Sequence, residues 1–239
     1  MYFGEVTDPN IRHIFRDAGD FIVRPLRCGK FTLYAYAIDG LTSGADTSEY
    51  VIKPITDNLQ GDTIQALYTS ALRGRVYNSV ADPCRDLDTV ALKLVNGFCV
   101  ILFPEAGAIA FEVKTGEKRG ISAPEVENTV KGAKDAFVET VRTNTSLLRR
   151  HLRSPELRLY ETRVGRRSLT NVTVCYVEGI TNPTLVGRMK KRLNDMDTDG
   201  FLSPAAVEEA VTGSRKTAFP LLQYTERADK FCAALLEGR

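Results

Sequence analysis

An internal repeat limits most strongly what this chain of 239 residues folds into. Residues 24–42 and residues 160–181 share a polar lead-in, a Gly followed by a basic residue, a β-rich run, an acidic residue with Gly, an aliphatic residue and Thr. The runs Phe31–Ile38 and Val172–Val177 are rich in β-branched and aromatic residues and predict buried strands. Because Gly reaches positive φ without steric cost, the Gly-basic pair before each run predicts a tight turn. The sequence therefore predicts one folding unit built twice.

Both copies continue with helical patterns. These cover roughly residues 48–59 in the first copy and roughly residues 183–196 in the second, where a proline suits the first helical position. Further on, Asp88–Gly97 parallels Asp229–Gly238, and each is a short amphipathic pattern that ends in Gly, a common helix terminator. The offset between the copies grows only from 136 (165 − 29) to 141 (238 − 97). The order of elements is therefore the same in both.

The first copy of the repeat ends with a pair of strand patterns that has no counterpart in the second copy. After Gly97 come two further strand patterns, F-C-V-I-L-F and A-I-A-F-E-V, joined by the turn P-E-A-G. In the second copy the sequence stops one residue after Gly238. We therefore expect the natural protein to continue beyond Arg239 with a comparable hairpin.

A helical pattern also lies between the copies. Gly132 interrupts it, so the expected helix runs over residues 133–153 and is closed by Ser154-Pro155. The predicted fold class is α/β, with two related subdomains of mixed sheets and helices joined by a long amphipathic helix: residues 1–124, the connector 125–155 and residues 156–239. The apolar positions that recur at steps of three and four are Val126, Val130, Ala133, Phe137, Val141, Leu148 and Leu152.

Composition excludes several classes of protein. Hydrophobic residues make up 43% and charged residues 26%, which is ordinary for a globular domain. A net charge of +2 lacks the basic excess typical of nucleic-acid binding. Five scattered cysteines without a C-x-x-C pair indicate reduced thiols in a cytoplasmic setting. The sequence shows no signal peptide and no apolar run of the roughly 20 residues that a membrane helix needs.

One motif resembles a metal site. The stretch D-M-D-T-D-G from Asp195 matches the first half of an EF-hand loop, but Ala206 occupies the position of the closing Glu. We interpret it as an acidic turn after a helix, with Ser203 capping the next helix and Pro204 opening it. The chain also lacks the G-x-S-x-G, H-E-x-x-H, Walker and G-x-G-x-x-G motifs. The sequence predicts no cofactor, no metal and no catalytic centre.

Two groups of charged residues have open interpretations. By helical spacing, Arg142 and Arg149 share a helix face with Arg153. This stripe either binds an anion, a headgroup or a partner, or is a solvated face whose charges complement the helix dipole. Glu226 and Arg227 either form ion pairs with the other lobe or with a partner protein, or lie at the start of a helix that Thr225 caps. The two histidines, at positions 13 and 151, are far apart in the sequence, and each is expected at the surface without a carboxylate companion.

The connector and the second copy resemble the A-subunit family of spore germinant receptors. The first copy adds I-D-G-L and K-T-G-E-K-R, although Gly116 stands where the family usually has a tryptophan before E-K-R. The family includes a paralogous A-type protein of the channel complex that exports dipicolinate. The stretches that carry the resemblance are Val130–Arg150, Val164–Arg167, Val174–Pro183, Asp197–Gly200 and Gln223–Arg239.

The resemblance implies a receptor component and not an enzyme. Such subunits are proteins of the spore inner membrane, with a cytosol-facing amino-terminal domain of two α/β subdomains before several membrane helices. They work with a transporter-like B subunit that senses nutrient and with a lipoprotein C subunit, they oligomerise, and the complex releases ions. This chain is then expected to be a regulatory and assembly domain that contacts B, C, other copies of itself and, through its missing part, the membrane.

Residues at matching family positions become candidates for contacts between subunits or lobes. Charge reversal at two of them, Arg149 and Arg150, is expected to impair assembly or germination while the isolated domain stays folded. Two alternatives stay open, the channel-complex paralogue and a two-lobed small-molecule-binding protein or enzyme with its site in a cleft. The candidate contacts are Lys131, Gly132, Arg142, Asn144, Arg149, Arg150, Glu226 and Arg227.

Overall fold

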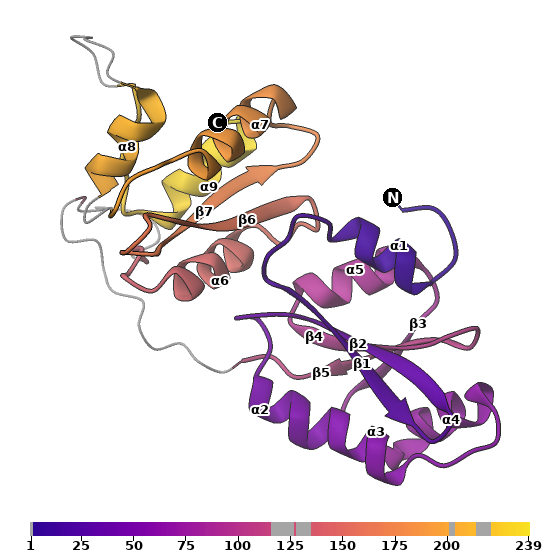
Figure 1. Cartoon of the computed structure of the whole chain (residues 1–239). Coiled ribbons are helices and arrows are strands. Elements are labelled where there is room, and N and C mark those ends of the chain that lie inside the picture. The colour runs from indigo at the N-terminus through magenta and orange to yellow at the C-terminus, as the bar shows by residue number, and fades with distance from the viewer. Residues whose placement is uncertain (1, 116–126, 128–134, 201–203, 214–220) are drawn as a thin grey trace. The chain divides into compact units, whose positions relative to one another are not determined.

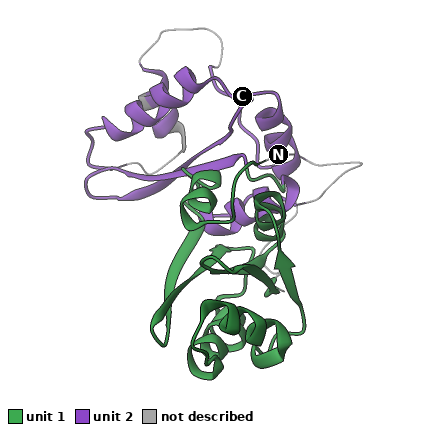
Figure 2. Cartoon of the chain, turned by 90° about the vertical axis from the view of Figure 1, so that its right-hand side faces the viewer, with its two compact units in different colours: residues 1–118, 153–155 green, residues 119–152, 156–239 purple. Residues whose placement is uncertain are grey.

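The computed structural model divides the chain into two compact units (Figure 2). Unit 1 comprises residues 1–118 and 153–155, and unit 2 comprises residues 119–152 and 156–239. The structure describes residues 2–115, 127, 135–200, 204–213 and 221–239. Each unit contains its own antiparallel sheet with helices on both faces, which is the mixed α/β class that the sequence predicts.

Unit 1 is a five-stranded sheet in the order β1-β2-β4-β5-β3, with every neighbouring pair antiparallel. Its helical turns η1 and η2 have the wider π-helical bonding. The elements are α1 (Asp8–Ile14), β1 (Phe21–Cys28), β2 (Phe31–Ile38), α2 (Gly44–Thr47), η1 (Ser48–Ile52), α3 (Lys53–Asn58), α4 (Ile64–Ser70), η2 (Ala71–Arg75), β3 (Ala81–Cys84), α5 (Leu87–Val95), β4 (Phe98–Phe103) and β5 (Gly107–Glu112).

Two hydrophobic clusters hold unit 1 together, one on each face of its sheet. Helices α1 and α5 cover one face, where Phe15 and Leu94 pack with Tyr36 of β2. Helices α3 and α4 cover the other, where Ile55 and Leu67 pack with residues of β4 and β5 (Figure 1). All six residues of β4 are buried because the strand lies inside the sheet with helices on both sides.

Unit 2 is smaller and its described sheet has two strands, β6 and β7. Helices α6 and α9 cover one face, with Leu148, Leu159 and Leu235 in the cluster, and α7 and α8 cover the other, with Leu193 and Val211. Among the helices that the structure describes, none has the length and hydrophobicity of a membrane span. The elements are α6 (Val141–His151), β6 (Leu157–Val164), β7 (Thr170–Val177), α7 (Pro183–Asn194), α8 (Pro204–Thr212) and α9 (Ala228–Leu236).

The two hairpins have the same length and the same pairing pattern. Strands β1 and β2 pair through eight consecutive residues each, and so do β6 and β7. Their loops differ, because residues 29–30 join β1 to β2 whereas residues 165–169 join β6 to β7. The three additional loop residues account for most of the growth of the sequence offset between the copies.

The turn after each hairpin is also the same. The carbonyl oxygen of the last strand residue accepts hydrogen bonds from the amides three and four residues later, at 3.2 and 3.2 Å for Ile38 and at 3.2 and 3.0 Å for Val177. The glycine inside this turn has a φ of 82° at Gly40 and 84° at Gly179. A side chain is strained at such φ values, which explains the glycine of the acidic-Gly pair in both copies of the repeat.

The predicted connector helix is shorter than expected and belongs to unit 2. Helix α6 starts at Val141, eight residues after the predicted start at Ala133, and ends at His151. Before it the chain is extended, since Ala136 forms a β-bridge with Arg227. Helix α6 packs on β7 and α9, and precedes β6 as α1 precedes β1. It is therefore a layer of unit 2 and not a spacer. The expected boundary at residues 124–125 lies outside the described residues.

Candidate functional site

Arg142 pairs with a carboxylate on the neighbouring strand of unit 2. Its Nη1 and Nη2 atoms lie 2.9 and 3.3 Å from the two carboxylate oxygens of Glu161 on β6, a two-pronged contact that fixes the orientation of both groups. The pair borders a mostly polar hollow of about 410 Å³ at the start of α6. The residues that line it are Glu139, Thr140, Val141, Arg142, Glu161, Thr162, Arg163, Asn171, Val172 and Thr173.

Asn144 fixes the chain that leads into α6. Its Oδ1 atom accepts a hydrogen bond of 2.8 Å from the amide of Val138, and its Nδ2 atom donates one of 2.6 Å to the carbonyl of Val138. The side-chain amide thus replaces a backbone partner for a residue outside any helix or strand. This candidate contact residue has an intramolecular role.

The arginine stripe does not form a single exposed face. Arg149 is 0% exposed and is the largest fully buried side chain among the described residues, whereas Arg150 is half-buried. Arg153 belongs to unit 1, where its Nη1 atom donates 3.2 Å to Asn96 Oδ1. Charge reversal at Arg149 would bury a carboxylate in the interior, so we now expect this variant to lose stability and not to stay folded.

Glu226 and Arg227 join the start of α9 to the chain before α6. Glu226 accepts two bonds from that chain, 2.8 Å from the amide of Glu127 to Oε1 and 2.7 Å from the amide of Phe137 to its carbonyl. The Nε atom of Arg227 donates 3.0 Å to Asp229 Oδ1. Thr225 Oγ1 accepts 3.1 Å from the amide of Arg227, so it caps this turn, while α9 itself begins at Ala228.

Five side chains form a polar clasp, which we define as Glu127, Thr225, Arg227, Asp229 and Lys230. Glu127 Oε2 accepts 3.1 Å from Thr225 Oγ1 and 3.0 Å from Lys230 Nζ. The hydrogen bond from Lys230 lowers the pKa of Glu127, and the one from Arg227 lowers the pKa of Asp229. The clasp is therefore ionised at neutral pH and stabilises the junction of the two segments.

A histidine has a carboxylate partner that the sequence did not reveal. His151 Nε2 lies 2.6 Å from Asp135 Oδ2, although the two residues are 16 positions apart. The expectation of a histidine without such a companion is wrong because the extended chain before α6 folds back along the helix. The candidates Lys131 and Gly132 lie outside the described residues.

The EF-like turn is paired with the hairpin loop. Helix α7 ends at Asn194, and beyond it Asp197 lies 2.5 Å from Arg166 and Asp199 lies 3.5 Å from Arg167. The acidic turn after a helix is thus as interpreted from the sequence, with Ser203 outside the described residues. In the described part of the chain, no group of three His, Cys, Asp or Glu side chains is arranged to hold a metal.

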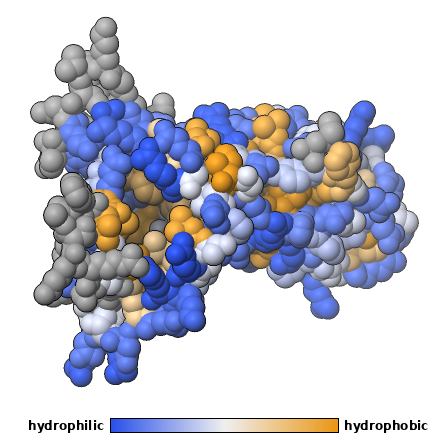
Figure 3. Space-filling view, turned by 90° about the horizontal axis from the view of Figure 1, so that it is seen from above, coloured by the Kyte–Doolittle hydropathy of each residue, from blue (hydrophilic) through white to orange (hydrophobic). Residues whose placement is uncertain are grey.

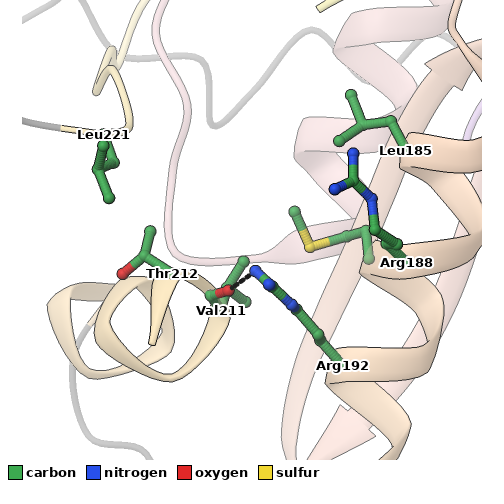
Figure 4. Close-up of a pocket in the computed structure, with 7 residues that line it drawn as sticks. Leu185, Arg188, Arg192, Val211, Thr212 and Leu221 are labelled. Carbon is green, nitrogen blue, oxygen red and sulfur yellow. Dashed lines mark hydrogen bonds between the residues drawn. The ribbon is translucent and has the colours of Figure 1, made fainter. Parts of the chain in front are cut away.

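A second hollow lies between α7 and α8 (Figure 4). Its volume of about 230 Å³ is below the roughly 300–1,000 Å³ of sites that enclose drug-sized ligands. Arg192 reaches across it and donates a hydrogen bond to the carbonyl of Val211 at the end of α8, where a cation complements the helix dipole.

From above, Figure 3 shows hydrophobic residues in a hollow of unit 2 with hydrophilic residues around it. We interpret the hollow as a helix–helix joint.

Comparison with known proteins identifies the family. The sequence model of the family described as "Bacillus/Clostridium GerA spore germination protein" matches residues 9–239. The chain belongs to the GerA family. The resemblance to the spore germination family that the sequence indicates is therefore confirmed.

Individual relatives of this GerA chain support the assignment. Stage V sporulation protein AF of Bacillus subtilis is 35% identical over 70% of this chain and 34% of its own length. Spore germination protein KA of the same organism is 26% identical over 96% of this chain and 43% of its own length. The chain thus spans less than half of these relatives.

A solved structure has the same fold. The N-terminal domain of the A subunit of the Bacillus megaterium spore germinant receptor GerK3 matches with a TM-score of 0.71 at 23% identity, over 96% of this chain and 86% of that chain. The expected A-subunit fold is therefore confirmed at the level of the whole chain.

Two of the stretches that resemble the A-subunit family contact each other inside unit 2. The loop V-G-R-R meets the turn D-T-D-G, because the amides of Arg166 and Arg167 each donate 2.8 Å to carbonyls of that turn. The chain before α6 meets Y-T-E-R-A-D-K through the polar clasp. Sequence reasoning found the arginines but missed their partners, Glu161 above all. Nothing in the sequence marks Glu161, because its partner is 19 residues away in a separate element.

Proposed function

We propose that this chain is the cytosol-facing N-terminal regulatory and assembly domain of a GerA-type A subunit in the spore inner membrane. In this role it couples nutrient sensing to ion release, and works with a transporter-like B subunit, a lipoprotein C subunit and further copies of itself. The observation that carries the proposal is the family match over residues 9–239. The likeness to an A-subunit N-terminal domain supports it at the level of fold.

Among the candidate contacts on α6, Arg150 is partly exposed, whereas Arg149 lies in the interior of unit 2. Arg150 is half-buried in the last turn of α6, where its charge complements the helix dipole. A partner carboxylate at this helix end would add to that interaction.

Spores that carry Arg150→Glu in the full-length protein test this role. We expect slower nutrient-triggered loss of optical density and reduced co-purification of the B and C subunits. The matched control is Arg167→Glu on the hairpin loop, a charge reversal at a side chain that is 83% exposed. A normal nutrient response with full recovery of B and C would contradict an assembly role for Arg150. A gene deletion that leaves the response to every nutrient unchanged would contradict the proposed function itself.

A second candidate function is that of the A-type paralogue in the dipicolinate channel complex. It is favoured because a relative named for sporulation and not for germination, Stage V sporulation protein AF, is 35% identical, against 26% for Spore germination protein KA. The same deletion separates the candidates. Loss of the response to one nutrient alone supports a receptor, whereas an altered dipicolinate content or release with every nutrient supports the channel complex.

A further inference from the structure

Strand β7 has one edge without a neighbouring strand among the residues that the structure describes. Strand β6 pairs along its other edge, and these two strands form the described sheet of unit 2. In unit 1 the equivalent strand β2 lies between β1 and β4. An open edge presents backbone donors and acceptors on which a further strand can add. The two units therefore differ at one edge of the same hairpin.

Helix α5 of unit 1 and helix α9 of unit 2 are equivalent and end in the same way. Gly97 follows α5 with a φ of 80°, and Gly238 follows α9 with a φ of 82°. A Cβ atom at Gly97 would lie 2.8 Å from the carbonyl oxygen of Leu41, and one at Gly238 would lie 3.2 Å from that of Ile180. Both glycines thus bring the chain against the same turn. After Gly97 the chain enters β4 at once and pairs with β2.

Side chains that are buried at this junction in unit 1 are exposed in unit 2. Val95 and Leu41 are 2% and 7% exposed, and they share a cluster with residues of β4 and β5. Their equivalents, Leu236 and Ile180, are 53% and 49% exposed. Apolar side chains gathered in this way indicate a surface that another segment covers.

We propose that in the full-length protein the segment directly after Arg239 adds to the open edge of β7 as a third, antiparallel strand. The relatives are more than twice as long as the part that matches, since the match covers 34% and 43% of two of them. The glycine geometry directs the chain to this edge, and the exposed Leu236 and Ile180 provide the apolar surface that the new strand and its continuation cover.

Unit 1 also gives the register of the new strand. Tyr36, two residues before the end of β2, pairs with Val100, the third residue after Gly97. Cys175, two residues before the end of β7, then lies opposite the third residue after Gly238. Because β4 is buried at all six positions, we expect a run of apolar residues there. Backbone hydrogen bonds would connect the sheet of unit 2 to the part of the protein that follows.

Disulfide cross-linking in the full-length protein tests the proposal. Directly opposed residues in antiparallel strands have Cα atoms about 4.5–5.5 Å apart, within the range that a disulfide spans. None of the five native cysteines forms a disulfide, and Cys175 is the one that is not fully buried. A cysteine placed at the third residue after Gly238 is expected to form an intramolecular disulfide with Cys175 on mild oxidation, visible as a mobility shift without reductant.

Two matched controls define the register. The same cysteine in a Cys175→Ser chain should form no cross-link, and a cysteine at the fourth residue should not react because its side chain points to the opposite face. Cross-linked dimers through Cys175 would overturn the proposal by placing a second copy at this edge. So would the absence of a cross-link from every position between the first and the fifth.

Hydrogen exchange on the unmodified full-length protein is a second measurement that needs no substitution. We expect the amides of β7 that face away from β6 to be protected about 10-fold more than the amides of the edge strand β1 that face away from β2. Exchange of β7 as fast as that of β1 would overturn the proposal, even if the cysteine variants fail to fold.

Discussion

Arg149 lies in the interior of unit 2, where its guanidinium needs partners because an isolated buried charge is costly. Replacement by Ala leaves those partners unpaired and a void around them. We expect Arg149→Ala to reduce the free energy of unfolding by about 3–5 kcal/mol. Urea denaturation of residues 1–239 measures this, with Arg167→Ala at an exposed position as the control. Equal midpoints for the two variants would show that Arg149 contributes no net stability.

Asn144 offers a second test at the level of single residues, because one side chain satisfies both the amide and the carbonyl of Val138. Asn144→Ala removes both bonds and is expected to cost about 1–3 kcal/mol. Asn144→Asp keeps the acceptor but sets an oxygen against the carbonyl of Val138, so it should be no more stable than the alanine variant. Thermal unfolding compares them, with the adjacent Thr143→Ala as the control. Full stability of Asn144→Asp would contradict the two-bond role.

At the scale of elements, the contact between the end of α5 and the turn after the first hairpin requires a glycine at position 97, whereas Gly179 is required by its backbone conformation alone. A Cβ atom at Gly97 would clash with the carbonyl of Leu41 at 2.8 Å, whereas one at Gly179 meets nothing within 4 Å. Both have positive φ, so both alanine variants carry the backbone cost of about 1–2 kcal/mol. We expect Gly97→Ala to be clearly the more destabilising in urea denaturation. Similar losses would mean that the clash relaxes at little cost.

The polar clasp makes the junction between α9 and the chain before α6 sensitive to acid. The pKa values of Glu127 and Asp229 lie below their ordinary values of 4.5 and 3.8, mainly because Lys230 and Arg227 donate hydrogen bonds to them. The folded state therefore binds fewer protons than the unfolded state, so this stabilisation is complete above the ordinary pKa values and is lost as the pH falls through the lowered ones. We expect the denaturant concentration at the unfolding midpoint to decrease when the pH is lowered below about 4.5.

The matched variant for this pH effect is the double substitution Glu127→Gln and Asp229→Asn. Without the two carboxylates, the midpoint between pH 6 and pH 3 should depend less on pH than in the unsubstituted chain. Denaturant titration at each pH measures it. Parallel curves for the two proteins would show that the acid sensitivity has another source.

The elements that the sequence predicted well are those with local signals. Strand β2 has the predicted bounds, and α5 and α9 lie where the paired amphipathic patterns place them. The start of α6 was wrong because residues 136–138 have helical spacing but obtain long-range partners, a bridge to Arg227 and the side chain of Asn144. Such partners depend on the tertiary fold, which overrides periodicity. The same limit applies to the candidate site. The sequence pattern identified the arginines, but it did not predict that Arg149 is buried or that Arg142 pairs with Glu161.

At the scale of the whole molecule, the two units have hydrophobic cores of very different size. Among the described residues, the clusters of unit 1 contain 18 and 16 buried residues, whereas those of unit 2 contain 6 and 3. Since stability rises with the apolar surface buried, unit 2 of the 239-residue chain should unfold at a lower denaturant concentration than unit 1. Hydrogen exchange followed by mass spectrometry resolves the two through peptides from β4 and β7.

Variants in each unit sharpen this last prediction. Gly97→Ala should move the β4 transition to lower denaturant and leave the β7 transition in place, whereas Asn144→Ala should do the reverse, because the neighbours of Gly97 described above lie in unit 1 and those of Asn144 lie in unit 2. A chain extended past Arg239 should move the β7 transition to higher denaturant, since a strand on the open edge of β7 adds backbone hydrogen bonds and buried apolar surface. One transition shared by both peptides in every variant would mean that the units unfold as a single cooperative body.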